Sequence, residues 1–156
     1  MDLSGDALAE VAQTLGADET VPKRAVMAAA SLLGEQTAEH MAAWVGPAEG
    51  GGDEWQALAI VGSGLLSVAA ERPSGDVSAH ADDTKLSARL VPIHSLRGVE
   101  VLDLANVDEH SGLSWRNGWR VVLDDTTIVI PRATSDEEVE ARDGLARALV
   151  ARLTSR

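Results

Sequence analysis

The chain has 156 residues, no cysteine, no phenylalanine and no tyrosine, and its formal net charge is −12. Without cysteine it has no disulfide, thiolate metal site or cysteine nucleophile. An acidic chain is also a poor candidate for binding nucleic acid or an anionic membrane, because phosphates are held by clustered lysine and arginine.

The beginning of the chain predicts neither a secretory signal nor a membrane anchor. The opening MDLSGDALAE has no basic segment followed by an apolar one. No apolar run approaches the roughly 20 residues that cross a bilayer. We therefore expect a soluble, cytoplasmic protein, and the composition, rich in alanine, valine and arginine with few lysines, is typical of a bacterial source.

Residues 1–36 are predicted to form a helical hairpin appendage. Apolar residues recur at helical spacing before Gly16 and again between Pro22 and Gly34, and each glycine is a typical helix end. Helices this short are not stable alone in water. They either pack on the rest of the chain, which is the favoured interpretation, or form a docking arm for another chain.

A domain of residues 37–156 is predicted to follow, and its first half alternates like β-structure. Residues 35–45 suit a helix or a strand, and the strand is preferred because strands follow. The segment WQALAIVGSGLLSVAAERP predicts a hairpin that turns at Gly62-Ser63-Gly64. Further strands are expected in 84–93 and 97–107, and the polar segments GPAEGGGDE, SGDVSAHADD and DEHSG are expected to be loops.

The segment SWRNGWRVVLDDTTIVIPR, residues 114–132, allows two interpretations. Asn117-Gly118 is a favoured pair for a two-residue hairpin turn. Alternatively, one continuous strand carries a bulge at Gly118, and Trp115 and Trp119 then share a face. Tryptophan and arginine are enriched at protein interfaces. The predicted interaction surface is therefore Trp115, Arg116, Trp119 and Arg120, although either tryptophan alternatively fills the core.

Residues 133–156 predict an amphipathic helix. Thr134 or Ser135 is expected to be its N-cap, and with Ser135 as the cap, Glu138, three residues later, completes a capping box. The acidic run at the start of this helix is explained by the positive end of the helix dipole, without a metal or a basic partner. The buried stripe is predicted to comprise Val139, Leu145, Ala146, Leu149 and Leu153.

The order of these elements resembles that of bacterial pleckstrin-homology-like domains of the PH and GRAM type, over about residues 37–154. The resemblance implies an α+β fold, in which an antiparallel β-barrel or sandwich of about seven strands is capped by a C-terminal helix and preceded by two short N-terminal helices. It also implies a scaffold for protein contacts or homo-oligomeric assembly. The loop that is basic in lipid-binding members is Gly62-Ser63-Gly64 here, which disfavours phosphoinositides. The segments that carry the resemblance are ALAIVGSGLLSVAAE, LVPIHSLRGVEV, WRVVLDDTTIVI and SDEEVEARDGLARALVARL.

No catalytic or metal-binding pattern is recognised, and no cofactor is expected. The histidines His40, His80, His94 and His110 are scattered, and the His-carboxylate groups HADD (80–83) and DEH (108–110) fall in predicted loops. Neither a Gly-x-Ser-x-Gly nucleophile elbow nor a full Gly-x-Gly-x-x-Gly fingerprint is present.

Three functions remain open at this point. The favoured one is a non-catalytic interaction or assembly module that binds a protein partner or itself. The second is a barrel that binds a small ligand or lipid, and the third is a small enzyme that uses the loop carboxylates and histidines.

Overall fold

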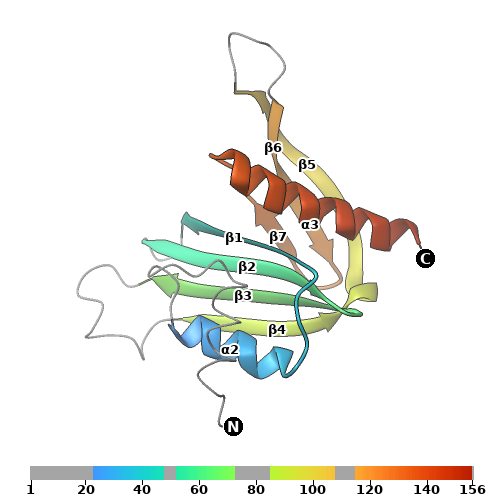
Figure 1. Cartoon of the computed structure of the whole chain (residues 1–156). Helices are drawn as coiled ribbons and strands as arrows, with labels where there is room; N and C mark the ends of the chain where they lie inside the picture. Colours follow the sequence, from blue (N-terminus) through green and yellow to red (C-terminus); the bar gives the residue numbers. More distant parts are fainter. Residues whose placement is uncertain (1–22, 48–51, 73–84, 108–114, 156) are drawn as a thin grey trace. The chain divides into compact units, whose positions relative to one another are not determined.

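The structure, a computed structural model, describes residues 23–47, 52–72, 85–107 and 115–155 (Figure 1). The chain divides into two compact units, Met1–Val91 and Pro92–Arg156. The first predicted helix and the loops 74–83 and 108–112 lie outside the described residues. The predicted boundary after residue 36 stays a prediction.

The first unit is a helix packed on a four-stranded antiparallel sheet. It contains α2 (Lys23–Leu33), β1 (His40–Pro47), β2 (Asp53–Val61), β3 (Gly64–Arg72) and β4 (Leu86–Pro92). The sheet order is β1-β2-β3-β4. The strand interpretation of residues 35–45 is therefore confirmed from His40 onward, and the predicted hairpin between β2 and β3 is also confirmed. Its turn begins at Gly62, whose φ of +57° lies in the region that favours glycine.

Helix α2 covers one face of this sheet (Figure 1). Because alternate residues of a strand point to the same face, Trp55, Ala57 and Ala59 of β2 lie on that face. Their side chains share one core with the helix and with alternate residues of β3. The members of this core are Ala25, Val26, Ala29, Leu33, Trp55, Ala57, Ala59, Val61, Leu66, Val68 and Ala70. The interpretation of the second N-terminal helix as a packing element is thus confirmed.

The second unit is a three-stranded antiparallel sheet with a long helix. A short 3₁₀ turn (Ile93–Ser95) leads into β5 (Leu96–Asn106), which is followed by β6 (Trp115–Leu123), β7 (Thr127–Ile130) and α3 (Asp136–Thr154). The sheet order is β5-β6-β7, and α3 lies across these strands in Figure 1. The predicted α+β class, seven strands and C-terminal helix are confirmed.

Of the two predicted alternatives, a barrel or a sandwich, the closed barrel is wrong for the strands that the structure describes. They form two separate sheets of four and three strands. The chain leaves β4 at Pro92, which has no N–H to donate to a ladder. It then makes a 3₁₀ turn of three residues instead of a hairpin turn. As a result β5 begins a new sheet.

Strand β6 runs without a break from Trp115 to Leu123. The predicted turn at Asn117-Gly118 is wrong, and the continuous strand is confirmed. The irregularity lies in the neighbouring strand, where the register shifts between Leu102 and Ala105. Within that bulge Asp103 has a φ of 49°, which aspartate tolerates better than most residues. The side chain of Arg132 donates to the backbone oxygen of Asp103 at 3.3 Å.

Candidate functional site

Trp115, the first of the four predicted surface residues, begins strand β6. It pairs with Asn106 of β5, and 57% of its surface is exposed. Large aromatic side chains are usually buried for most of their surface. Of the two interpretations of Trp115, core packing is wrong and surface exposure is confirmed.

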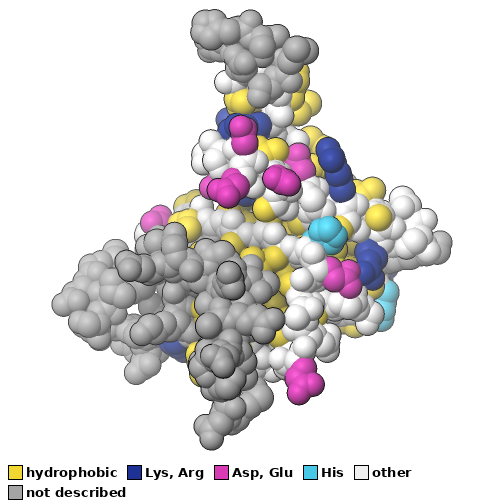
Figure 2. All heavy atoms as spheres, in the orientation of Figure 1, with side chains coloured by type: hydrophobic (Ala, Val, Ile, Leu, Met, Phe, Trp, Pro, Cys, Tyr) yellow, Lys and Arg dark blue, Asp and Glu magenta, His cyan; other side chains and the backbone are white. Residues whose placement is uncertain are grey.

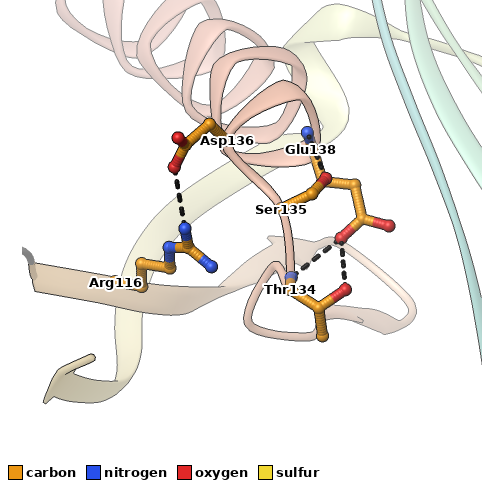
Figure 3. A network of polar contacts seen from close by, with 5 residues as sticks. All are labelled: Arg116, Thr134, Ser135, Asp136 and Glu138. Atoms are coloured by element: carbon orange, nitrogen blue, oxygen red, sulfur yellow. Dashed lines mark hydrogen bonds and ion pairs between the residues drawn. The ribbon is translucent and has the colours of Figure 1, made fainter. Parts of the chain in front are cut away.

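Arg116 follows Trp115 but lies closer to the protein. Its Nη2 donates to Oδ1 of Asp136 at 2.7 Å, and only 18% of its side chain is exposed. Asp136 is the first residue of α3, so this ion pair ties β6 to the start of the helix (Figure 3). Arg116 therefore has a structural partner, and a binding partner would meet its remaining exposed edge.

Trp119 is half-buried beside α3. Its indole Nε1 donates to Oδ1 of Asp143 at 3.2 Å. In the sheet it lies between Val101 of β5 and Ile130 of β7. The hydrogen bond and the partial burial make Trp119 a link between sheet and helix, and the structure favours its packing role over a free surface.

Arg120 lies opposite Glu100 in the ladder between β5 and β6. Its Nη1 donates to Oε2 of Glu100 at 2.7 Å, and both side chains are about half exposed, 43% and 52%. A pair this exposed stabilises a fold by about 0–1 kcal/mol. Arg120 is therefore accessible, but its charge is already compensated.

An exposed apolar surface runs along β5 and β6 beside Trp115. In Figure 1 the two paired strands extend past the end of α3, and Figure 2 shows hydrophobic side chains on this part, next to the grey atoms. The exposed fractions are 54% for Val101, 60% for Leu104, 43% for Val107 and 57% for Trp115. We call Val101, Leu104 and Trp115 the apolar strip; Val107 follows Asn106, the register partner of Trp115, and therefore points to the other face.

Sequence reasoning found only one member of the apolar strip. The valines and leucines of β5 were assigned to a strand, and their alternation gave no sign of which face would be covered. Val101 pairs with Trp119, and Trp115 precedes Trp119 by four residues on the same strand. All three therefore lie on one face of the sheet, but α3 partly covers only Trp119.

Three arginines of the second unit form ion pairs within that unit. Arg97 bonds Asp124, Arg120 bonds Glu100 and Arg116 bonds Asp136. Each pair joins two elements that are adjacent in the second unit. Because Arg116 and Arg120 alternate with Trp115 and Trp119 along β6, they lie on the opposite face of the sheet.

The start of α3 is held by the predicted capping box, which is confirmed. Ser135 Oγ accepts from the backbone N–H of Glu138 at 3.2 Å. In return Glu138 Oε2 accepts from the backbone N–H of Thr134 at 2.8 Å and from its hydroxyl at 3.0 Å (Figure 3). The return bond therefore reaches the residue before the N-cap. Hydrogen bonding from the Thr134 backbone lowers the pKa of Glu138 more than its partial burial raises it.

Arg142 is a buried cation that sequence reasoning missed. Only 7% of its surface is exposed, and burial lowers its pKa. Its Nη1 donates to the backbone oxygen of Pro131 at 2.7 Å, and its Nη2 lies 3.7 Å from Oε2 of Glu138. The sequence feature that could have identified Arg142 is its position, three residues before Leu145 and inside the apolar stripe.

Of the predicted apolar stripe of α3, Leu145, Ala146 and Leu149 are buried.

The second unit is expected to lose stability in acid through Glu138. A carboxyl whose pKa is lower in the folded state contributes stability above its unfolded value, here 4.5, and loses it as the pH falls through the folded value. We expect Glu138→Gln to flatten the pH dependence of the free energy of unfolding as the pH falls below about 4.5. Urea denaturation followed by circular dichroism at several pH values measures this slope. Glu137→Gln, in the same helical turn, is the control and should leave the slope unchanged.

The described part of the chain contains no candidate metal centre. No group of three or more histidine, aspartate or glutamate side chains there could hold a metal ion. His40 and His94 are exposed. The sequences HADD and DEH lie outside the described residues. No helix among the described residues is long and apolar enough to cross a membrane.

Comparison with known proteins adds no relative. A scan against protein-family models found no match, and searches of the curated proteins and of the solved structures found none either. The resemblance to pleckstrin-homology-like domains therefore stays a prediction from the sequence.

Proposed function

We propose that this chain acts in the cytoplasm as a non-catalytic protein-interaction or assembly module, and that the apolar strip is its contact surface. The observation that supports the proposal is the exposure of Val101, Leu104 and Trp115, each more than half exposed on the paired strands β5 and β6. Contiguous exposed apolar side chains usually mark interaction sites. Burial of apolar surface yields about 25 cal/mol per Å² before the costs of association.

The predicted surface residues contribute to this proposal unequally. Trp115 is the exposed aromatic anchor, and aromatic anchors dominate binding energies at many interfaces. Arg120 lies on the opposite face of β6, where its exposed charge is compensated by Glu100. Arg116 and Trp119 are held by Asp136 and Asp143, so they support the surface rather than form its centre.

The two other functions have less support. A ligand-binding barrel needs an enclosed interior, and the described strands form two open sheets. An enzyme that uses a metal needs a cluster of ligating side chains, and the described residues hold no group of three or more histidine, aspartate or glutamate side chains that could bind one. Nucleic acid and anionic membranes are disfavoured by the net charge of −12.

A photo-crosslinking amino acid at position 104 tests the proposal in the cells that produce the protein. We expect irradiation to give protein–protein adducts from position 104. Position 27 is the control, because Met27 is also an exposed apolar residue, 45% exposed, on helix α2. Adducts that are equally abundant from both positions, or absent from position 104, would contradict the proposed surface.

A further inference from the structure

We infer that Asn117 is a site of spontaneous deamidation, and that this modification places a negative charge on the face that carries the apolar strip. The reaction converts asparagine to aspartate or isoaspartate, and it needs only the backbone nitrogen of the next residue and water. Three properties of the described residues support the inference: the glycine that follows Asn117, the place of Asn117 in the strand ladder, and its neighbours on the face. The effect of the charge on binding rests on the proposed function, whereas the modification itself does not.

The residue after Asn117 supplies the attacking atom. The backbone nitrogen of Gly118 attacks Cγ of Asn117, and the side-chain nitrogen leaves as ammonia together with the proton that Gly118 loses. Water then opens the resulting five-membered succinimide ring at either of its two carbonyl carbons, without any transfer of electrons. One product is aspartate, and the other is isoaspartate, in which the main chain runs through the former side chain. Because glycine has no Cβ atom, its nitrogen is the least hindered backbone nitrogen for this attack.

Packing requires the glycine at position 118. A Cβ atom there would lie 2.8 Å from the backbone oxygen of Ile130, so a larger residue would force the main chain to move. The side chain of Asn117 lies along this glycine, because its Nδ2 donates to the backbone oxygen of Gly118 at 2.7 Å. The fold therefore keeps the reactive amide next to the one residue type that attacks it most readily.

The end of β6 that contains Asn117 is paired on one side only. Strand β7 pairs with residues 119–122 of β6, whereas residues 115–118 pair with β5 alone. A two-stranded ribbon of this kind is only marginally stable. Extended backbone keeps the nitrogen of the next residue away from the side-chain carbon, so residue 117 must leave the extended conformation before it reacts. We therefore expect the reaction to proceed from a locally opened state of this ribbon.

The contacts that oppose this opening are few at Asn117 itself. It is the one residue of β6 without a register partner in β5, because it lies opposite the shift between Leu102 and Ala105. The neighbouring ion pair between Arg116 and Asp136 resists opening only weakly, since 98% of the Asp136 side chain is exposed. The register shift thus coincides with the reactive residue.

The charge of the product falls on the proposed contact surface. Side chains alternate along a strand, so Asn117, which is half-buried, shares a face with Trp115 and Trp119. Across the ladder it lies opposite the bulge that contains Leu104. Deamidation replaces a neutral amide there by a carboxylate, and covering a carboxylate without a partner is far more costly than covering an amide. A protein bound to the strip should therefore hold the modified chain more weakly.

Peptide mapping by mass spectrometry tests the modification on the purified full-length protein. The protein is kept in mildly alkaline buffer, which favours loss of the proton from Gly118, and samples are taken over time. We expect Asn117 to convert in the folded protein, about tenfold or more slower than in guanidinium chloride, where no opening step is needed. Isoaspartate and aspartate should both appear, because water opens the ring at two positions. Aspartate alone would indicate direct hydrolysis and would overturn the attack by Gly118.

Asn106 is the matched control within the same molecule. It is the only other asparagine of the chain, and it lies opposite Trp115 in the same two-stranded ribbon. Opening of the ribbon frees both asparagines, but Asn106 precedes Val107, whose branched side chain hinders the attack. Asn106 should therefore stay unconverted in the folded protein. Equal conversion at both positions would overturn the inference, and so would an Asn117 that converts in guanidinium chloride but never in the folded protein.

Asn117→Asp separates the effect of the charge from the altered main chain of isoaspartate. If the strip is the contact surface, this variant should give about tenfold fewer adducts from position 104 than the unchanged protein. Val107→Asp is the control, because Val107 is 43% exposed on the opposite face of the same ribbon, and it should leave the adducts unchanged. Circular dichroism establishes that both variants are folded.

The outcomes separate the modification from the proposed function. Undiminished adducts from Asn117→Asp would overturn the effect of the modification on the strip, even if the peptide map shows conversion. If the unchanged protein gives no adducts from position 104, the proposed function fails, while the peptide map still decides whether Asn117 is modified.

Discussion

Replacing Trp55 by alanine is expected to destabilise the first unit by about 3–5 kcal/mol. Trp55 is 3% exposed and shares its core with α2 and β3. Many members of that core are alanines, including Ala25, Ala29 and Ala57. Side chains this small have no rotamers that fill the space an indole leaves, so most of the cavity should persist. Urea denaturation monitored by far-ultraviolet circular dichroism measures the loss.

Trp115→Ala is the matched control for this prediction. It removes the same atoms from a side chain that is 57% exposed, and exposed substitutions of this kind usually change stability by no more than about 0.5 kcal/mol. If the two variants lost similar stability, Trp55 would not be the core residue that the structure describes. If Trp115→Ala also reduced the adducts from position 104, that loss would separate the binding role of this tryptophan from a role in folding.

The difference between these tryptophans illustrates what the sequence could predict. Alternation in β2 and β3 and the Gly62-Ser63-Gly64 turn were sufficient to place a hairpin, because glycine near a two-residue turn is a local signal. The capping box of α3 was predictable for the same reason, since Ser135 and Glu138 are three residues apart. Burial of a tryptophan, in contrast, depends on what covers its face, and alternation along one strand does not contain that information.

The barrel was the main error in the predicted architecture. A regular series of short strands is compatible with one closed sheet or with two open ones, because both have the same alternation along the chain. The two architectures differ at the connection between β4 and β5. Pro92 and a 3₁₀ turn stand there in place of a hairpin turn. The break between the two sheets thus falls at residues 93–95.

The candidate surface was predicted in part. The pattern of tryptophan and arginine in β6 identified Trp115 and the exposed Arg120. It did not identify Leu104 or Val101, because exposed apolar residues in a strand resemble core residues in sequence. It also missed that Arg116 and Trp119 have carboxylate partners in α3, Asp136 and Asp143, which lie 20 and 24 residues later. Such pairs follow from the packing of α3 on the sheet, not from any local motif.

Replacing Gly118 by alanine is expected to destabilise the second unit by about 1–3 kcal/mol, the usual cost of overpacking. A Cβ atom on Gly118 would lie 2.8 Å from the backbone oxygen of Ile130 and 3.3 Å from the backbone nitrogen of Arg132. Both are main-chain atoms, which cannot change rotamer to make room. The segment that must move includes Pro131, whose oxygen accepts the hydrogen bond from buried Arg142. Denaturation curves of the variant and the unchanged protein, recorded in parallel, measure the difference.

Gly98→Ala is the matched control for this prediction. Gly98 lies in β5 opposite Val122, and an added Cβ there meets no atom within 4 Å. Its φ is outside the region that favours glycine, so alanine should stabilise the chain by about 0.4–1 kcal/mol through the unfolded state. Opposite signs at two glycines of the same sheet would show that Gly118 is required by the close approach of residues 130–132. This requirement also explains the misleading turn signal, since Asn117-Gly118 has the composition of a tight turn while its glycine makes room for a neighbouring backbone. If both variants were stabilised, the close approach at Gly118 would be contradicted.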